Sequence, residues 1–291
     1  MCAQKTKITP RALQELKAKG ERAVLLTAYD VNIAKIEDEL GIDIILVGDS
    51  AGMVMLGYEN TLQVTMDEML VFTRAVARAA KRAMIIADMP FMSYQPSREI
   101  ATKNAGEFIR AGADGVKLEG GEHICHIIEY LVKIGIPVMG HIGMTPQSIK
   151  QLSGYRVCGR TQEERKKLVQ DAIALEEAGV FSIIVECVLP DVTREIHERL
   201  HIPVYGIGSG PHCDGQILVV KNTFAVYQVK SPIYVKKYAN LGEIILKAVQ
   251  EYVKEVKSGE FPSKEHSFHM KKEKYEKLLD VLGRKEEAKE T

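Results

Sequence analysis

Short apolar runs alternate with helical patterns along most of this 291-residue chain, from residue 23 to about residue 257. The runs are rich in β-branched residues and apolar on both faces, which is typical of parallel strands covered by helices. Eight strand–helix units are the count of a (β/α)8 barrel, whose typical length is about 250 residues. The predicted strands lie within residues 22–29, 42–50, 83–90, 113–121, 136–143, 181–190, 202–210 and 215–220.

The structural alternative is a doubly wound open sheet. Such a sheet usually carries a glycine-rich fingerprint after its first strand, and the segment LLTAYD at residues 25–30 has none. The nearest candidate, GIGSGP at residues 206–211, places Pro211 where the third glycine should stand. The sequence therefore favours an α/β fold of the TIM-barrel class.

Segments outside the barrel pattern lie at the two ends of the chain. Residues 1–20 predict an extra helix, because Thr9 and Pro10 suit the cap and the first turn. We expect one catalytic domain over residues 1–262, including this helix, and a charged extension over residues 263–291 that is helical or partly disordered. Within the strand–helix pattern, two predicted helices begin with capping-box sequences, Thr65-x-x-Glu68 and Thr161-x-x-Glu164.

Charge and cysteine content exclude several classes of protein. Lys+Arg and Asp+Glu each total 39, so the balance gives no electrostatic reason to expect nucleic acid or an anionic membrane as partner. The N-terminus lacks the apolar core of a signal peptide, and no apolar run is long enough to span a bilayer. The five cysteines are scattered without a CxxC pair, which argues against a zinc ribbon and favours a reducing compartment. We expect a cytoplasmic protein.

Polar side chains recur at the C-terminal ends of the predicted strands, where a barrel places its active site. Each has a structural reading when taken alone, such as a turn residue for Asp49 or an ion pair for Lys117 and Glu119. Their recurrence at successive strand ends favours a functional site. The set comprises Asp49, Ser50, Asp88, Lys117, Glu119, His141 and Glu186.

Three of these acids, Asp49, Asp88 and Glu119, follow neighbouring strands and would repel one another unless a cation lies among them. Carboxylate oxygens with open positions for water and substrate suit Mg²⁺ better than zinc. Glu186, set apart on the sixth strand, could be a general base, which typically contributes ~10²–10⁴ in rate. The combination predicts proton removal beside a metal-chelated carbonyl, which is enolate chemistry.

Several sequence blocks, in order along the chain, carry a more specific signal. They are TAYD (27–30), VGDSAGMV (47–54), ADMPFMSY (87–94), GADGVKLEGG (112–121), PVMGHIGMTPQS (137–148), ECVLP (186–190), GIGSG with CDGQILV (206–219) and KEHSFH (264–269). From about Leu26 to His269, the sequence resembles the ketopantoate hydroxymethyltransferase family of the phosphoenolpyruvate/pyruvate barrel superfamily.

This resemblance implies a reaction in which 2-oxoisovalerate takes a one-carbon unit from the co-substrate 5,10-methylenetetrahydrofolate. The product, ketopantoate, serves pantothenate and coenzyme A synthesis. The resemblance also implies one Mg²⁺ per subunit on Asp49 and Asp88, with Glu119 completing the site directly or through water. Members of the family usually assemble as homo-decamers. The resemblance implies that the oxo acid is bound by Asp49, Ser50, Asp88 and Lys117. It implies that Glu186 is the proton acceptor.

Two alternatives keep the barrel but change its role. One is a Mg²⁺-dependent carbon–carbon or phosphorus–carbon lyase of the isocitrate lyase or phosphoenolpyruvate mutase type, although the reactive-cysteine lid motif resembling KKCGH is absent. The other is a barrel that serves assembly or ligand binding, which would not require both a metal site and a base. Residues 50–64 are long for a strand-to-helix connection and predict a lid that orders on substrate binding.

Overall fold

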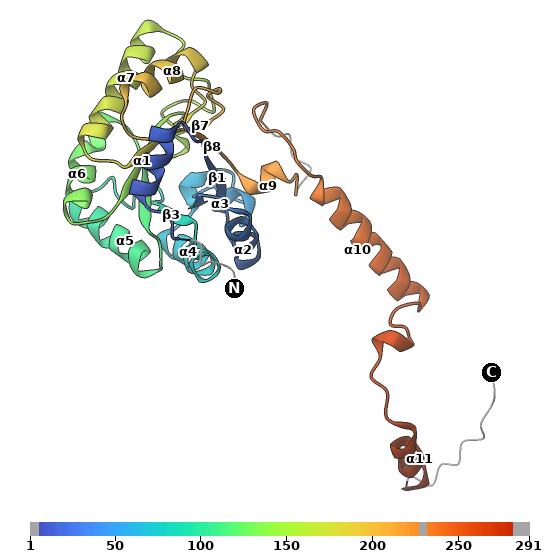
Figure 1. Ribbon diagram of the computed structural model, residues 1–291. Coiled ribbons are helices and arrows are strands. Elements are labelled where there is room, and N and C mark those ends of the chain that lie inside the picture. Colours follow the sequence, from blue (N-terminus) through green and yellow to red (C-terminus); the bar gives the residue numbers. More distant parts are fainter. Residues whose placement is uncertain (1–5, 227–231, 282–291) are drawn as a thin grey trace. The chain divides into compact units, whose positions relative to one another are not determined.

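The computed structural model describes residues 6–226 and 232–281. Its eight parallel strands form one closed barrel, in which each strand pairs with the next and β8 pairs with β1 (Figure 1). The prediction of a TIM-barrel fold is confirmed, and the open-sheet alternative is wrong. The strands are β1 (Ala23–Thr27), β2 (Ile44–Val47), β3 (Met84–Asp88), β4 (Gly115–Glu119), β5 (Val138–Gly143), β6 (Ser182–Glu186), β7 (Val204–Ile207) and β8 (Gly215–Leu218).

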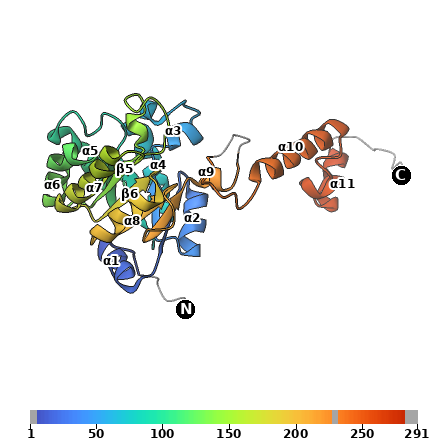
Figure 2. The same cartoon turned by 90° about the horizontal axis from the view of Figure 1, so that it is seen from above.

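Helices that follow the first six strands lie around the outside of the barrel (Figure 2). They are α2 (Val31–Leu40), α4 (Met66–Ala79), α5 (Arg98–Arg110), α6 (Cys125–Lys133), α7 (Gln162–Glu177) and α8 (Pro190–Arg199). Shorter helical segments lie in the connections that follow β2, β4, β5 and β8. These are α3 (Ala51–Val54), η1 (Thr61–Gln63), η2 (Glu122–Ile124), η3 (Pro146–Ser148) and α9 (Val220–Thr223).

The connection between β7 and β8 differs from the expected strand–helix rhythm. Residues 208–214 contain no helix, and Gly208 and Gly210 have φ angles of +63° and +83°. A backbone in the left-handed region at two alternate positions, followed by Pro211, forms turns in place of a helix. The expected helix after the seventh strand is therefore absent.

Of the two predicted capping boxes, the one at α4 forms both of its hydrogen bonds and the one at α7 forms only one. Thr65 and Glu68 form both hydrogen bonds of a capping box at the start of α4. Thr161 caps α7 by accepting the backbone N–H of Glu164. The Glu164 carboxylate, however, accepts the N–H groups of Gly159 and Arg160, so it orders the loop before the helix.

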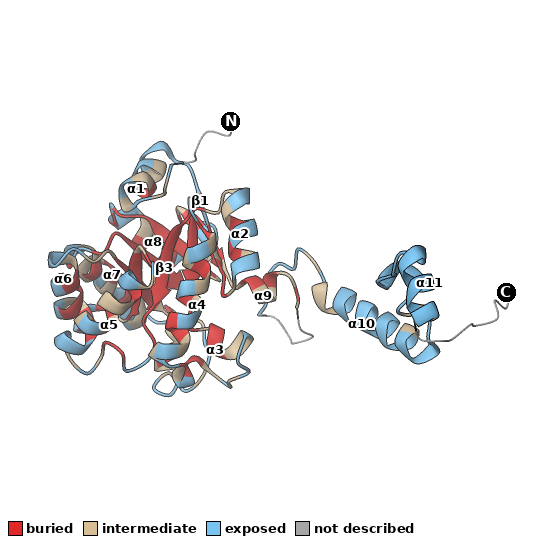
Figure 3. Cartoon of the chain, turned by 90° about the horizontal axis from the view of Figure 1, so that it is seen from below, coloured by how far each residue is buried: buried red, intermediate tan, exposed pale blue. Residues whose placement is uncertain are grey.

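The barrel interior is an apolar core that is closed at its N-terminal end by the extra helix, α1 (Pro10–Lys19). Thr9 caps this helix, as the sequence predicts. Leu13 of α1 joins the buried interior residues, and Lys17 donates to Asp214 over 2.9 Å at the start of β8. Figure 3 shows that burial concentrates in the strands. With one end sealed by packing, the opposite end is left as the accessible mouth.

The chain divides into two compact units, residues 1–239 and residues 240–291, and the barrel belongs to the first. The second contains α10 (Leu241–Ser258), η4 (Lys264–His266) and α11 (Lys272–Val281). Within it, the Phe261 ring packs between the rings of Tyr252 and His266. The expectation of a catalytic domain over 1–262 and an extension over 263–291 stays a prediction, and residues 282–291 lie outside the described residues.

No helix in the described part of the chain has the length and apolar character needed to cross a membrane.

Candidate active site

The barrel places the predicted polar side chains at one mouth, as the strand-end argument requires. They line a cavity of about 460 Å³. Strand register brings them together, because Asp88 on β3 pairs with Lys117 on β4, and Glu119 pairs with His141 on β5. The residues brought together are Asp49, Ser50, Asp88, Lys117, Glu119, His141 and Glu186.

Asp49, Asp88 and Glu119 form a buried acidic cluster. Each is at most 5% exposed, and one carboxylate oxygen from each lies within 4.8 Å of the others. Within the described residues, this group has the composition and spacing to hold a metal ion. Hard carboxylate oxygens without a histidine or cysteine ligand favour Mg²⁺ or a similar hard cation over zinc.

One ammonium group lies against this acidic cluster. Lys117 Nζ donates to both oxygens of Asp88, at 2.7 and 2.8 Å, and to Glu119 Oε1 at 3.2 Å. Asp49 has no such contact with Lys117, and its Oδ2 accepts an N–H of the Gln147 amide. Three carboxylates and one ammonium leave the cluster with an excess of negative charge when all are ionised.

The excess charge is visible in the pKa directions. Burial, followed by the charges of Asp88 and Glu119, raises the pKa of Asp49 well above its usual value. Burial also raises the pKa of Asp88, although Lys117 opposes it. For Glu119, burial is outweighed by Lys117 and His141, so its pKa falls to about 2. Burial first, and the neighbouring acids second, therefore oppose ionisation of Asp49 and Asp88, and a bound cation would favour it.

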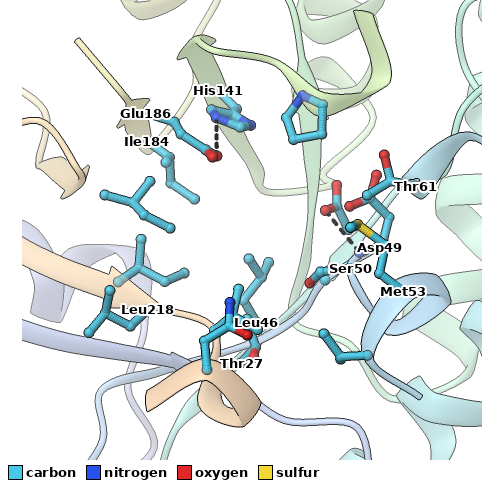
Figure 4. Close-up of a pocket in the computed structure, with 18 of the residues that line it drawn as sticks. Thr27, Leu46, Asp49, Ser50, Met53, Thr61, His141, Ile184, Glu186 and Leu218 are labelled. Atoms are coloured by element: carbon cyan, nitrogen blue, oxygen red, sulfur yellow. Dashed lines mark hydrogen bonds and ion pairs between the residues drawn. The ribbon is translucent and has the colours of Figure 1, made fainter. Parts of the chain in front are cut away.

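Glu186 faces the cavity from the side opposite Asp49 and Ser50 (Figure 4). Its side chain is 13% exposed, and His141 lies between it and the acidic cluster. The two ring nitrogens of His141 are each 3.3 Å from a carboxylate oxygen, Nδ1 from Glu119 and Nε2 from Glu186. Burial and Lys117 lower the pKa of His141, but the two carboxylates raise it to about 9 overall. The imidazole ring therefore connects the acidic cluster with Glu186.

Sequence reasoning missed three polar residues that support this site. Gln147, in η3, contacts both Asp49 and Glu119, and Tyr94 contacts Glu119 and Gln147. The Tyr29 hydroxyl lies 2.8 Å from Ser50 Oγ. All three lie inside the sequence blocks quoted above, in the segments that follow β1, β3 and β5. Their place after a strand is the feature of the sequence that could have identified them.

The thiol nearest the mouth has the properties of an unreactive group. Cys187 follows Glu186 and lines the cavity, and burial with the neighbouring Glu186 charge raises its pKa to about 11. A thiol with this pKa is protonated at neutral pH, whereas the thiolate is the nucleophile. The described cysteines, Cys125, Cys158, Cys187 and Cys213, are all free.

Comparison with known proteins shows extensive similarity to one group of enzymes. A match to the protein family described as "Ketopantoate hydroxymethyltransferase" covers residues 7–264. A 3-methyl-2-oxobutanoate hydroxymethyltransferase from Caldicellulosiruptor bescii is 51% identical over 262 residues, which are 90% of this chain and 99% of the relative. An enzyme of the same name from Pyrococcus furiosus is 49% identical over 279 residues, 96% of this chain and 98% of the relative.

Solved structures with the same fold are much more distant in sequence. A phosphonopyruvate hydrolase in complex with oxalate and Mg²⁺ has a TM-score of 0.58 and 14% identity, over 94% of this chain and 98% of that one. A 2,3-dimethylmalate lyase of the PEP mutase/isocitrate lyase superfamily has a TM-score of 0.56 and 15% identity, over 94% and 95% of the two chains. At these identities the similarity shows the barrel fold alone.

Proposed function

This chain belongs to the ketopantoate hydroxymethyltransferase family, and we propose that it transfers a hydroxymethyl group to 3-methyl-2-oxobutanoate, also called 2-oxoisovalerate, to give ketopantoate. The donor is 5,10-methylenetetrahydrofolate. The observation that carries the proposal is the acidic cluster of Asp49, Asp88 and Glu119 at one side of the cavity in the barrel mouth, with Glu186 at the other. A 2-oxo acid between them has its carbonyl at the cluster and its C3 hydrogen toward Glu186.

One Mg²⁺ per subunit belongs at the acidic cluster, with Asp49, Asp88 and Glu119 as the residues that hold it. Their oxygens are close enough for one small cation, and their negative charge exceeds that of Lys117. Bound Mg²⁺ supplies a Lewis acid that polarises the oxo-acid carbonyl and stabilises an enolate.

The oxo acid is oriented by residues on the cluster side of the cavity. Ser50, whose hydroxyl is held by Tyr29, and the Lys117 ammonium are the donors available to a substrate carboxylate or to the developing enolate oxygen. Asp49 and Asp88 complete the oxo-acid-binding positions. The branched end of the substrate lies against the apolar interior of the barrel, where Leu46, Ile184 and Ile217 line the cavity.

Glu186 is the proton acceptor. Its carboxylate takes the hydrogen from C3, and the electron pair of the broken C–H bond forms the enolate. Water breaks the two C–N bonds of the donor's methylene carbon: its two hydrogens go to the two nitrogens of tetrahydrofolate, which leaves, and its oxygen stays on the carbon as a formaldehyde-level carbonyl. The enolate carbon forms a C–C bond with this carbon, whose C=O π electrons move to the oxygen, and that oxygen takes the proton held by Glu186 to become the hydroxyl of ketopantoate. His141, 3.3 Å from Glu186 Oε2, holds the base on the substrate side. A positioned base of this kind contributes about 10²–10⁴ in rate.

The folate has the outer part of the cavity available, where Tyr155 and Tyr234 provide aromatic surface. Such rings suit a flat heteroaromatic group. We further propose homo-oligomeric assembly as a decamer, which the resemblance implies, and a cytoplasmic location, which the scattered cysteines without a CxxC pair favour. Light scattering of the purified protein tests the assembly, and a monomer would contradict it.

Exchange of the C3 hydrogen of the oxo acid tests the proposed chemistry directly. In D₂O with Mg²⁺ and 2-oxoisovalerate, the protein should exchange this hydrogen, as followed by proton NMR, and form ketopantoate only when methylenetetrahydrofolate is added. Glu186→Gln should lose exchange by about 10²–10⁴-fold and still bind the metal. The matched control is Glu163→Gln, the same change at an exposed position.

Outcomes separate this reaction from its rival. Exchange that persists unchanged in Glu186→Gln would remove this residue from its role. Cleavage of a carbon–carbon or phosphorus–carbon bond without folate would favour the lyase alternative, whose fold neighbours share only 12–16% of this sequence. Absence of exchange and of product with wild-type protein and Mg²⁺ would contradict the proposed function itself.

A further inference from the structure

Gln147 contacts two of the three acids in the acidic cluster, although it comes from neither of their strands. It lies in η3, just after β5, and is 5% exposed. Its side-chain Nε2 donates to Asp49 Oδ2 over 3.0 Å, and its backbone N–H donates to Glu119 Oε2 over 2.9 Å. One residue therefore connects the acid that follows β2 with the acid that ends β4.

The orientation of the Gln147 amide is fixed by its other partners. Nε2 also donates to the carbonyl oxygen of Met89 over 2.9 Å. Oε1 accepts from the Tyr94 hydroxyl at 3.0 Å and from Gln95 Nε2 at 3.1 Å. A flipped amide would bring its oxygen against the Asp49 carboxylate and the Met89 carbonyl oxygen, which are both acceptors. The network therefore points an N–H, and not an oxygen, at Asp49.

Tyr94 ties this amide to the backbone of Glu119. Its hydroxyl accepts the Glu119 N–H at 3.1 Å, and its single proton has two acceptors within reach, Gln147 Oε1 at 3.0 Å and the Glu119 carbonyl oxygen at 2.9 Å. The Tyr94 side chain is 1% exposed, so these groups have no water to replace a lost partner. Asp49 and Glu119 therefore cannot move apart without breaking several buried hydrogen bonds.

The chemistry of this contact favours a role in metal binding over simple neutralisation of charge. Gln147 uses one oxygen of each acid, Oδ2 of Asp49 and Oε2 of Glu119, while Lys117 and His141 contact the other oxygen of Glu119. An amide fixes the positions of the carboxylates without cancelling their charge, whereas a second lysine here would weaken attraction for a cation. Donors behind ligand carboxylates fix their direction, and their loss typically costs 10–100-fold in metal affinity.

We propose that Gln147 is a positioning residue for the divalent metal, and that it holds Asp49 and Glu119 at the separation that one cation bridges. The inference rests on the metal site of the proposed function and adds a residue that touches neither metal nor substrate. Tyr94 supports Gln147 in this role through their shared hydrogen bond.

Metal titration of a small set of variants tests this role. Gln147→Leu removes the amide but keeps the backbone N–H and a similar volume, and should weaken Mn²⁺ binding by about 10–100-fold in isothermal titration calorimetry. Tyr94→Phe keeps the ring and loses only the hydroxyl, so it should weaken binding in the same direction by less. Gln151→Leu, the same change at an exposed position beyond η3, should bind Mn²⁺ as the wild type does.

A kinetic readout separates positioning from general damage to the site. Because Gln147 contacts no reacting atom, kcat at saturating metal should stay close to the wild-type value in Gln147→Leu, while the metal concentration for half-activity rises. Unchanged Mn²⁺ affinity in Tyr94→Phe and in any folded Gln147→Leu would overturn the positioning role and leave the proposed function intact. A fall in kcat with unchanged metal affinity would also overturn it. Wild-type protein that binds no Mn²⁺ would overturn the metal site and this inference together.

Discussion

The two ends of the barrel both carry charged side chains, but they balance the charge in different ways. At the N-terminal end, three aspartates each precede a strand, accept a backbone N–H from the preceding strand and pair with one cation. These trios are Asp43 with Val24 N–H and Arg82, Asp114 with Ile85 N–H and Lys7, and Asp214 with Val204 N–H and Lys17. Each carboxylate here has its own counter-charge.

The C-terminal mouth lacks this one-to-one pairing. Asp88 and Glu119 share the Lys117 ammonium, Asp49 makes no ion pair with it, and all three are more deeply buried than the acids at the other end. Burial raises the pKa of Asp49, whereas backbone and side-chain donors keep the pKa of Asp214 below its usual value. Matched charges join strand ends and stabilise the barrel, while unmatched charges prepare a site for a cation. The same residue type therefore serves structure at one end and chemistry at the other.

The largest expected effect comes from removing the ammonium at the mouth. Lys117→Met removes the ammonium that pairs with Asp88 and Glu119, and should lower the free energy of unfolding by about 3–5 kcal/mol in the absence of divalent metal. Lys17→Met, the matched change at the other end, removes a partner that is 17% exposed and should cost less, about 1–3 kcal/mol. Urea denaturation measures both. An equal loss of unfolding free energy in the two variants would mean that the acids at both ends are paired with positive charge to the same extent.

Added metal should stabilise the mouth and leave the other end unaffected. At a Mg²⁺ concentration of 100 times its dissociation constant, the free energy of unfolding should rise by about 2.7 kcal/mol. Asp88→Asn should lose most of this gain, because one of the three acids is gone. Asp43→Asn should keep it in full, although its own stability is lower. Denaturation with and without Mg²⁺ gives the comparison, and a gain retained in Asp88→Asn would contradict the metal assignment.

Much of this contrast follows from the sequence, because strand ends are easy to recognise. An apolar run that ends in a charged residue gives both the position and the direction of that residue. In this way Asp49, Asp88, Glu119 and Glu186 are predicted at one mouth, and the cavity contains all four. The convergence follows from the closed parallel barrel alone, since every strand points the same way.

Residues on loops could not be predicted in the same way. The sequence does not say that η3 folds back so that Gln147 reaches Asp49, because a loop path depends on contacts that are distant in sequence. The helix expected after β7 is absent because local turn preferences at Gly208 and Gly210 outweigh the repeating rhythm. Roles such as metal ligand and proton acceptor remain predictions until they are measured.

Neutralising one acid at each end should change stability in opposite directions. Without metal, Asp49→Asn should raise the free energy of unfolding by about 1 kcal/mol near pH 7, since it removes a buried repulsive charge yet keeps an acceptor for Gln147. Asp214→Asn should lower it by about 1–3 kcal/mol, because hydrogen bonds to a charged acceptor are lost. A loss of stability in both variants would mean that the mouth carries no excess charge.

The pH dependence of these two variants separates the ends further. The folded pKa of Asp49 is raised, so its contribution to stability is full below the unfolded value of 3.8 and is lost as pH rises through the folded pKa. The advantage of Asp49→Asn should therefore grow with rising pH. The folded pKa of Asp214 is lowered, so its contribution is full above 3.8 and is lost as pH falls through the folded pKa. The deficit of Asp214→Asn should therefore shrink in acid.

The smallest expected effect concerns the two segments that lie over the ends of the barrel, α1 at the N-terminal end and residues 50–64 at the mouth. Leu13 of α1 is buried in the interior, whereas the segment over residues 50–64 holds only the short α3 and η1 and exposes Leu56. Chymotrypsin cleavage at Leu56 and Tyr58 should slow by about threefold with Mg²⁺ and the oxo acid together, which corresponds to ordering by less than about 1 kcal/mol. Cleavage at Leu16 in α1 should not change, because α1 already packs against the barrel interior without ligands. Mass spectrometry of the early fragments reports both sites, and equal cleavage of residues 50–64 with and without these ligands would show that the mouth has no ligand-dependent lid.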